Sequence, residues 1–219
     1  MKKPAGRAAA AVRAAAPPEL RLEDAPMSDI IDVLAGGQVT ATALAKAYLA
    51  RIAAYDRHGP MLNSVRALNP DALALAAKLD GIKPSAKRPL AGVPILLKDN
   101  IATSDKQPTT AGSLALEGAR AKRDATVVKL LRKAGAVILG KANLTEFANI
   151  LAIEMPSGYS SLGGQVKNPY VPALMDDKGI PIVDPGGSSS GSAVAVARPA
   201  CAQPRSAPRR RARCCIPRA

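Results

Sequence analysis

Apolar positions recur along the chain with spacings that predict helices and strands in mixed order. Between residues 28 and 57 they return every three to four positions, which predicts two helices. The first is expected over 29–35, with Ser28 as its cap and Gly36-Gly37 at its end, and the second begins at Thr40 or Thr42. Residues 63–69 then predict a short strand, and residues 71–79 predict a helix that ends at Gly81.

Two apolar runs further along predict strands of one sheet. Residues 90–100 (Leu-Ala-Gly-Val-Pro-Ile-Leu-Leu-Lys-Asp-Asn) predict a buried strand with a polar end, and residues 136–139 predict a strand of the parallel type. Between them Asp124 is expected to cap a helix with four inward residues, Val127, Val128, Leu130 and Leu131. Residues 156–187 predict a loop, which leads through Gly186-Gly-Ser-Ser-Ser-Gly-Ser into a small-residue helix. The order of elements predicts an α/β fold.

Charge divides the 219 residues into three parts. Residues 198–219 contain seven Arg and no acid, and residues 1–15 contain four Lys or Arg and no acid. These ends therefore carry +7 and +4 of the net charge of +14, which leaves +3 for residues 16–197. We expect residues 1–17 to be a disordered leader, residues 18–197 to hold the folded part, and residues 198–219 to be a disordered tail. The expected location is the cytoplasm, or an exported form if the leader is a degraded signal.

Composition excludes several classes of protein. No apolar run approaches the roughly 18 to 20 residues that span a bilayer, so we expect no membrane helix. Four Tyr, one Phe and no Trp give little for stacking on single-stranded nucleic acid. All three Cys lie in the tail, and the one histidine, His58, is expected in solvent at a helix end. We therefore expect no metal site and no Ser-His-Asp triad.

Two features of the folded part suggest chemistry, and each has an ordinary alternative. Lys98, at the end of an apolar strand, either extends its amine to solvent or lies desolvated with a lowered pKa, as a base. The Gly-Gly-Ser-Ser-Ser-Gly-Ser run is either a flexible linker or a phosphate-binding loop before a helix. It lacks the Gly-Lys-Ser ending of a nucleotide-binding loop.

Taken together with Asp-Ala-Thr-Val-Val-Lys-Leu-Leu and Gly140-Lys-Ala-Asn-Leu-Thr-Glu-Phe147, these segments resemble the amidase signature family over about residues 18–197. Gly163-Gly-Gln-Val-Lys-Asn-Pro-Tyr170 is most similar to the peptide amidase branch. The resemblance implies the N-terminal part of an α/β fold whose mixed sheet is flanked by helices. It also implies hydrolysis of small-molecule or peptide amides to an acid and ammonia or an amine, with no cofactor. No membrane or specific nucleic-acid partner is implied, and the oligomeric state stays open.

The resemblance also implies roles for individual residues. Lys98 matches the base, and Ser188 matches the serine that relays protons across a cis peptide. Further members of the site are expected to support the serine loop: Asp99, Gly186, Gly187, Ser189 and Ser190. The attacking serine of the family follows the relay serine by about two dozen residues in a Gly-Thr-x-x-Gly-Ser segment, but Ala212 stands there among arginines.

We interpret the change in composition at residue 198 as a shifted reading frame. Codons allowed for residues 206–217, read two bases later, can spell Gly-Thr-Glu-Thr-Ala-Gly-Ser-Met-Leu-Tyr-Pro, and the recovered serine falls at residues 212–213. We therefore expect this chain to be inactive and prone to aggregation, since apolar surface stays uncovered. Two alternatives stay open: a component of the amidotransferase that amidates misacylated transfer RNA, and a basic nucleic-acid-binding protein that uses its tail.

Overall fold

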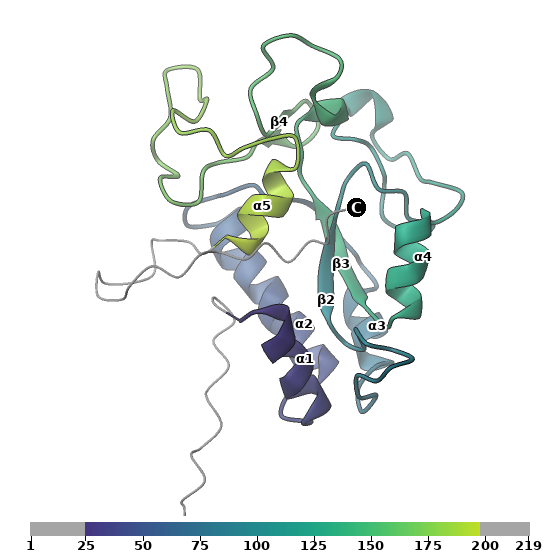
Figure 1. The fold of residues 1–219 in the computed structure, drawn as a ribbon. Helices are drawn as coiled ribbons and strands as arrows, with labels where there is room; N and C mark the ends of the chain where they lie inside the picture. Colours follow the sequence, from purple (N-terminus) through teal and green to yellow (C-terminus); the bar gives the residue numbers. More distant parts are fainter. Residues whose placement is uncertain (1–24, 198–219) are drawn as a thin grey trace, which may run out of the picture.

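A mixed three-stranded sheet lies at the centre of residues 25–197, the part of the chain that the computed structural model describes (Figure 1). The strands are β1 (Val65–Leu68), β2 (Pro94–Lys98) and β3 (Val137–Ala142), in the order β1-β3-β2. Strand β3 runs antiparallel to β1 and parallel to β2. This arrangement confirms the α/β class, the mixed sheet and the parallel pairing of the two apolar segments.

Strand β3 is the most enclosed element of the sheet, and all six of its residues are buried. A side chain at Gly140 would place its Cβ 2.3 Å from the carbonyl oxygen of Ala67 in β1, so the close pairing of these strands requires glycine. The register pairs Leu97 with Lys141 and Lys98 with Ala142. Since side chains alternate across a sheet, Lys98 and Lys141 lie on opposite faces.

Helices cover both faces of the sheet. On one face, alanines of α2 (Ala41–Arg51) and α3 (Ala72–Ala77) pack against Val137 and Leu139. On the other, Val128 of α4 (Thr126–Lys133) packs against Leu97 and Ile138. The remaining helical elements are α1 (Met27–Ala35), the π-helical η1 (Ile52–Arg57), η2 (Leu114–Leu116), η3 (Glu146–Asn149) and α5 (Ser190–Val196). The sheet is thereby fixed between helices, as Figure 1 shows.

The predicted helix caps are right at one position and wrong at two. Thr40 caps α2, and its hydroxyl accepts a hydrogen bond from the amide of Ala43 at 3.1 Å. Ser28 lies inside α1, which begins after Pro26, because proline suits the start of a helix. Asp124 does not cap α4: its carboxylate accepts instead from the Ser104 amide at 2.7 Å and from Arg132.

The inward face of α4 is narrower than predicted. Val128 is buried and Leu131 packs beside it, but Val127 and Leu130 are exposed. The four residues span too wide an arc of an eight-residue helix for all of them to meet one sheet.

Residues 156–187 are mainly loop, as expected, with one short hairpin of β4 (Tyr159–Ser160) and β5 (Gly164–Gln165). The expected leader, residues 1–17, and the tail, residues 198–219, lie outside the described residues. Within residues 25–197, no helix is both long and apolar enough to cross a membrane.

Candidate active site

Lys98 and Ser188 meet at the carboxyl end of β2. The Nζ atom of Lys98 donates hydrogen bonds to the hydroxyl oxygen of Ser188 at 2.8 Å and to that of Ser189 at 3.0 Å. Ser188 lies in the serine loop, residues 186–190, which leads into α5, and the peptide bond between Gly187 and Ser188 is cis. The two residues predicted as base and relay are thus in direct contact, although 90 positions separate them in the chain.

Burial lowers the pKa of the Lys98 amine from its ordinary value of 10.5. The side chain is half-buried and turns toward the serine loop, so it does not simply extend into solvent. A lowered pKa increases the fraction of neutral amine near pH 7, and a neutral amine can accept a proton from the hydroxyl it contacts.

The backbone of the segment after β3 holds the serine loop in place. The amide of Thr145 donates to the carbonyl oxygen of Ser188 at 3.0 Å, and the Thr145 hydroxyl accepts from the amide of Gly158 at 2.8 Å. The amide of Gly191 donates to the carbonyl oxygen of Asn143 at 3.1 Å. Asn143 and Thr145 are buried positioning residues that were not predicted from the sequence, although both follow the apolar strand as polar residues.

Close packing explains the small residues in and beside the loop. A Cβ added at Gly191 would lie 2.3 Å from the carbonyl oxygen of Ser64 and 2.4 Å from that of Asn143. Gly186 has a φ of +80°, which favours glycine, and its carbonyl oxygen accepts a hydrogen bond from the Ser190 hydroxyl. The Gly-Ser run is therefore an ordered turn rather than a flexible linker.

Asp99 supports a different segment from the one predicted. Its buried carboxylate forms an ion pair with Arg66, at 2.7 Å from Nε to Oδ2, and accepts from the Thr110 hydroxyl and from the Gly112 amide at 3.2 Å. Among the described residues, these groups and not the serine loop hold the carboxylate. Asp99 thereby fixes β1 and residues 110–112 to the end of β2, because a buried carboxylate needs such partners.

A second lysine, Lys141, is buried on the other face of the sheet. Its Nζ atom donates to the carbonyl oxygen of Ile101 and to the hydroxyl of Thr109 at 3.0 Å. Desolvation lowers its pKa to about 8, and the nearby Asp99 and Asp105 carboxylates oppose this change. No role was predicted for Lys141 from the sequence.

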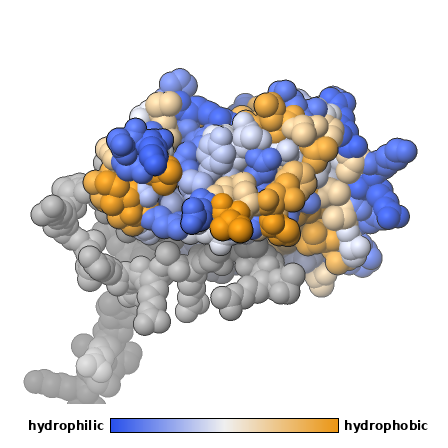
Figure 2. Space-filling model, turned by 90° about the horizontal axis from the view of Figure 1, so that it is seen from above, coloured by the Kyte–Doolittle hydropathy of each residue, from blue (hydrophilic) through white to orange (hydrophobic). Residues whose placement is uncertain are grey.

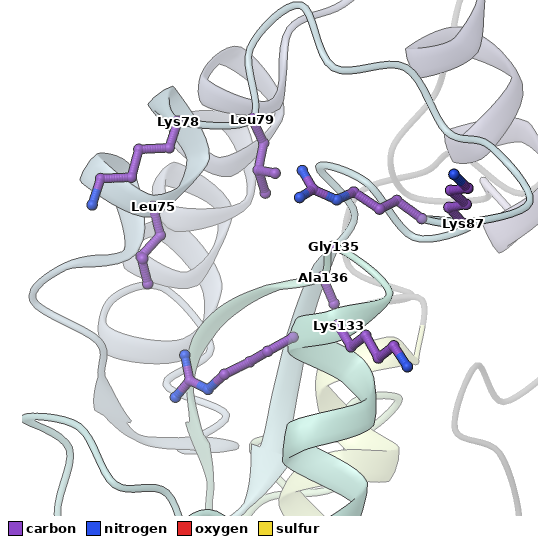
Figure 3. Close-up of a pocket in the computed structure, with 9 residues that line it drawn as sticks. Leu75, Lys78, Leu79, Lys87, Lys133, Gly135 and Ala136 are labelled. Carbon is purple, nitrogen blue, oxygen red and sulfur yellow. The ribbon is translucent and has the colours of Figure 1, made fainter.

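A cavity of about 520 Å³ lies beside the start of β3, and Figure 3 shows the residues that line it. Gly135 and Ala136, which directly precede β3, contribute to its lining together with Leu75 and Leu79. The basic residues that also line it are Lys78, Lys87, Arg88, Arg132 and Lys133. Since Val137 pairs with Pro94 at the start of β2, this cavity is separate from the contact of Lys98 with Ser188.

Other predicted features contribute nothing to the candidate site. His58 is exposed at the end of η1, and its Nδ1 lies 2.9 Å from the carbonyl oxygen of Ala53. Within residues 25–197, no group of three or more His, Cys, Asp or Glu residues is arranged to hold a metal ion. Ala212, which stands at the position expected for an attacking serine, lies outside the described residues.

The fold and this contact define a class of α/β protein in which a lysine at a strand end meets a serine loop before a helix. Comparison with known proteins gives the family: the chain belongs to the amidase family, whose model matches residues 43–203. It is 42% identical over 180 residues to a putative amidase of Schizosaccharomyces pombe, and the match covers 81% of this chain and 29% of the relative.

Solved and functionally distinct relatives extend the comparison. The native peptide amidase of Stenotrophomonas maltophilia is 48% identical, with a TM-score of 0.68, over 76% of this chain and 32% of that one. A glutamyl-tRNA(Gln) amidotransferase subunit from Renibacterium salmoninarum is 43% identical over 167 residues, which cover 75% of this chain and 29% of the relative. The chain thus spans about a third of the length of the relatives it matches.

Proposed function

We propose that this chain supplies the lysine base and the relay serine of a centre that hydrolyses carbon–nitrogen bonds of small or peptide amides. The observation that carries the proposal is the 2.8 Å hydrogen bond from Lys98 to Ser188, together with the lowered pKa of the amine. The 48% identity to a peptide amidase favours peptide or small amides as substrates.

The proton transfers of the proposed reaction use only serine hydroxyls, the amine and water. As the attacking serine oxygen bonds to the amide carbon, its proton passes to Ser188 while the proton of Ser188 passes to neutral Lys98. The carbon–nitrogen bond then breaks, and the proton returns through Ser188 to the leaving nitrogen. Water cleaves the resulting ester by the same relay to release the carboxylic acid. Acylation and deacylation each therefore end with Lys98 neutral and Ser188 protonated, as they began.

The attacking serine is the component that this chain does not supply, because Ala212 and its arginine neighbours stand at the position expected for it. Donors to the developing oxyanion belong to the same segment of the family, and one such donor alone is typically worth about 10² to 10³ in rate. We therefore expect the 219-residue chain to hydrolyse no amide above background.

Ammonia release from a panel of simple amides tests the proposal. The 219-residue chain is compared with a chain whose reading frame is restored after residue 197, each also as Lys98→Ala. Activity confined to the restored chain and lost with Lys98→Ala is the expected result. Turnover by the 219-residue chain that depends on Lys98 would contradict it, as would restored activity that does not need Lys98.

The 43% identity to a glutamyl-tRNA(Gln) amidotransferase subunit supports a second function. In that case the restored chain would require a partner protein, and it would amidate misacylated transfer RNA rather than hydrolyse free amides. Nucleic-acid binding by the basic tail is a third function, which predicts salt-dependent binding that disappears when residues 198–219 are deleted.

A further inference from the structure

The cavity beside the start of β3 combines apolar and basic residues (Figure 3). Its apolar part consists of Leu75 and Leu79, which are both partly buried, together with Ala136. Five basic residues and no acidic residue complete the lining. The volume of about 520 Å³ lies within the range of sites that bind small organic molecules, roughly 300 to 1,000 Å³.

Backbone contacts fix the elements around the cavity relative to one another. The amide of Leu90 donates to the carbonyl oxygen of Ala134 at 2.9 Å, which ties the loop before β2 to the end of α4. Two backbone hydrogen bonds between Ser85 and Arg88, at 3.0 and 3.2 Å, close a turn in the same loop. On the other side, alanines of α3 pack against β3. The cavity is therefore formed by elements that are held together without a ligand.

Most of the basic residues in the lining have no carboxylate partner. Arg132 is the exception, since it forms ion pairs with Asp105 at 2.6 Å and with Asp124 at 3.1 Å. Positive charges that no anion neutralises raise the potential in the space between them and attract an anion. Within residues 25–197, four residues of the lining form no ion pair: Lys78, Lys87, Arg88 and Lys133.

Helix ends account for only part of this charge. Lys133 lies in the last turn of α4 and Lys78 directly follows α3, where the carbonyl groups of a helix end stabilise a cation. Each helix end is equivalent to about half a negative charge, so the two ends together offset about one of the four cations. Lys87 and Arg88 belong to no helix, and their charges have no such explanation.

Apolar residues elsewhere on the surface lie in a different setting. Figure 2, which views the molecule from above Figure 1, shows them lying openly among hydrophilic residues. Ile153, for example, is 95% exposed on a loop. Leu75 and Leu79 instead line a hollow together with cations. This combination favours a ligand that has both a negative group and an apolar body.

We propose that the cavity binds a small carboxylate with an apolar body, such as an aromatic acid. The guanidinium group of Arg88 presents paired N–H donors that fit both oxygens of a carboxylate. Figure 3 shows the amines of Lys78 and Lys133 on opposite sides of the group, so positive charge surrounds the apolar part. The apolar body would remove the surface of Leu75 and Leu79 from water, which a small inorganic anion would not do.

Fluorescence titration of the 219-residue chain with 2-naphthoate tests this site. We expect one saturable site whose affinity falls as salt is added, because salt screens the cations. The neutral 2-naphthalenemethanol lacks the charge, and inorganic phosphate lacks the apolar body. Each should therefore bind at least about tenfold more weakly than 2-naphthoate.

Two double variants distinguish the cavity from basic surface in general. Lys87→Gln combined with Arg88→Gln should weaken 2-naphthoate binding at least about tenfold, because it removes two of the unpaired cations. The matched control is Lys122→Gln combined with Arg123→Gln, a neighbouring pair that is also exposed but lies outside the lining. The control should leave binding unchanged. Both variants keep the basic tail, so anion binding by its arginines would not separate them.

A third variant tests the apolar part of the cavity. Leu75→Trp keeps all five basic residues and fills space between them, so it should also weaken 2-naphthoate binding at least about tenfold. Circular dichroism and the urea midpoint show whether this variant is folded. If it does not fold, the two double variants, which replace exposed side chains, still decide the question.

Several results would overturn the proposal. They are the absence of saturable 2-naphthoate binding, equal affinities of the two double variants, and unchanged binding by folded Leu75→Trp. Binding of inorganic phosphate or of the neutral alcohol as tightly as 2-naphthoate would overturn it as well. None of these measurements involves amide hydrolysis, so failure of this proposal is distinguishable from failure of the proposed function.

Discussion

The buried amine of Lys141 should make the stability of this protein rise between pH 8 and pH 10.5. Its pKa falls to about 8 in the folded chain because burial disfavours the charged form, while its ordinary value is 10.5. Between these two values the unfolded chain binds a proton that the folded chain does not. Raising the pH through this window therefore stabilises the folded state, and below pH 8 no stabilisation from this group is gained.

The magnitude follows from the width of the window. Each pH unit within it is worth about 1.4 kcal/mol, so full titration adds about 3 kcal/mol to the free energy of unfolding. The neutral amine still carries two N–H groups, which are enough for the carbonyl oxygen of Ile101 and the hydroxyl of Thr109. Both hydrogen bonds are thus kept after deprotonation, and only the free-energy cost of burying the charged amine is removed.

Urea unfolding followed by circular dichroism at several pH values between 7 and 10.5 measures the effect against Lys141→Met. Methionine keeps an unbranched apolar stem but removes the titrating group, and its two lost hydrogen bonds cost a roughly constant amount of about 1 to 3 kcal/mol at every pH. Other lysines and tyrosines titrate in both proteins. The free energy of unfolding of the wild-type chain should therefore increase relative to that of the variant as the pH rises from 8. A constant difference between the two proteins across this pH range would refute the reasoning.

The remaining predictions concern packing, charge pairing and the base. Gly191→Ala should lower the free energy of unfolding by about 2 to 3 kcal/mol, because the added Cβ would meet two backbone oxygens. The control Gly36→Ala, at a position where φ is −69°, should change the free energy of unfolding by less than about 1 kcal/mol. Similar urea midpoints for the two variants would contradict this prediction. Asp99→Asn should cost about 3 to 5 kcal/mol by leaving Arg66 buried without its anion, and adding Arg66→Met should recover part of that loss in the same assay. In a carbon-13 NMR titration, Lys98 should lose its proton at a pH below its ordinary 10.5, and a transition at or above that value would argue against desolvation.

Local sequence was sufficient for the elements whose structure depends on neighbours in the chain. The apolar segments that form β2 and β3 need only bury their side chains on a sheet. Gly36 marks the C-terminal end of α1, and Thr40 marks the N-terminal start of α2. The assignment of α4 was less complete, because spacing identifies a helix but not how much of its surface a twisted sheet can cover. Val127 and Leu130 satisfy the helical period and are nevertheless exposed.

The candidate site shows why some of its residues could not be found from local pattern. Considered alone, Lys98 is either an amine extended to solvent or a desolvated base. Only the resemblance to a family indicates the serine loop, 90 positions later, as its partner. The contact of Thr145 with Ser188 carries no comparable signal, because it is made by a backbone amide, and every residue other than proline has such an amide.

The structural role of Asp99 also could not be predicted from the local sequence. The resemblance to the family implies a role for Asp99 in supporting the serine loop, but successive residues of an extended chain point to opposite faces. The lysine and the carboxylate therefore diverge at the end of β2. The Asp99 carboxylate therefore contacts Arg66, Thr110 and Gly112 and stabilises the end of β2 on the face opposite to the one on which Lys98 contacts the serines. Lys98 and Asp99 are neighbours in the sequence, but their side chains point in opposite directions. The lysine therefore takes part in the proposed chemistry, whereas the carboxylate supports the end of β2.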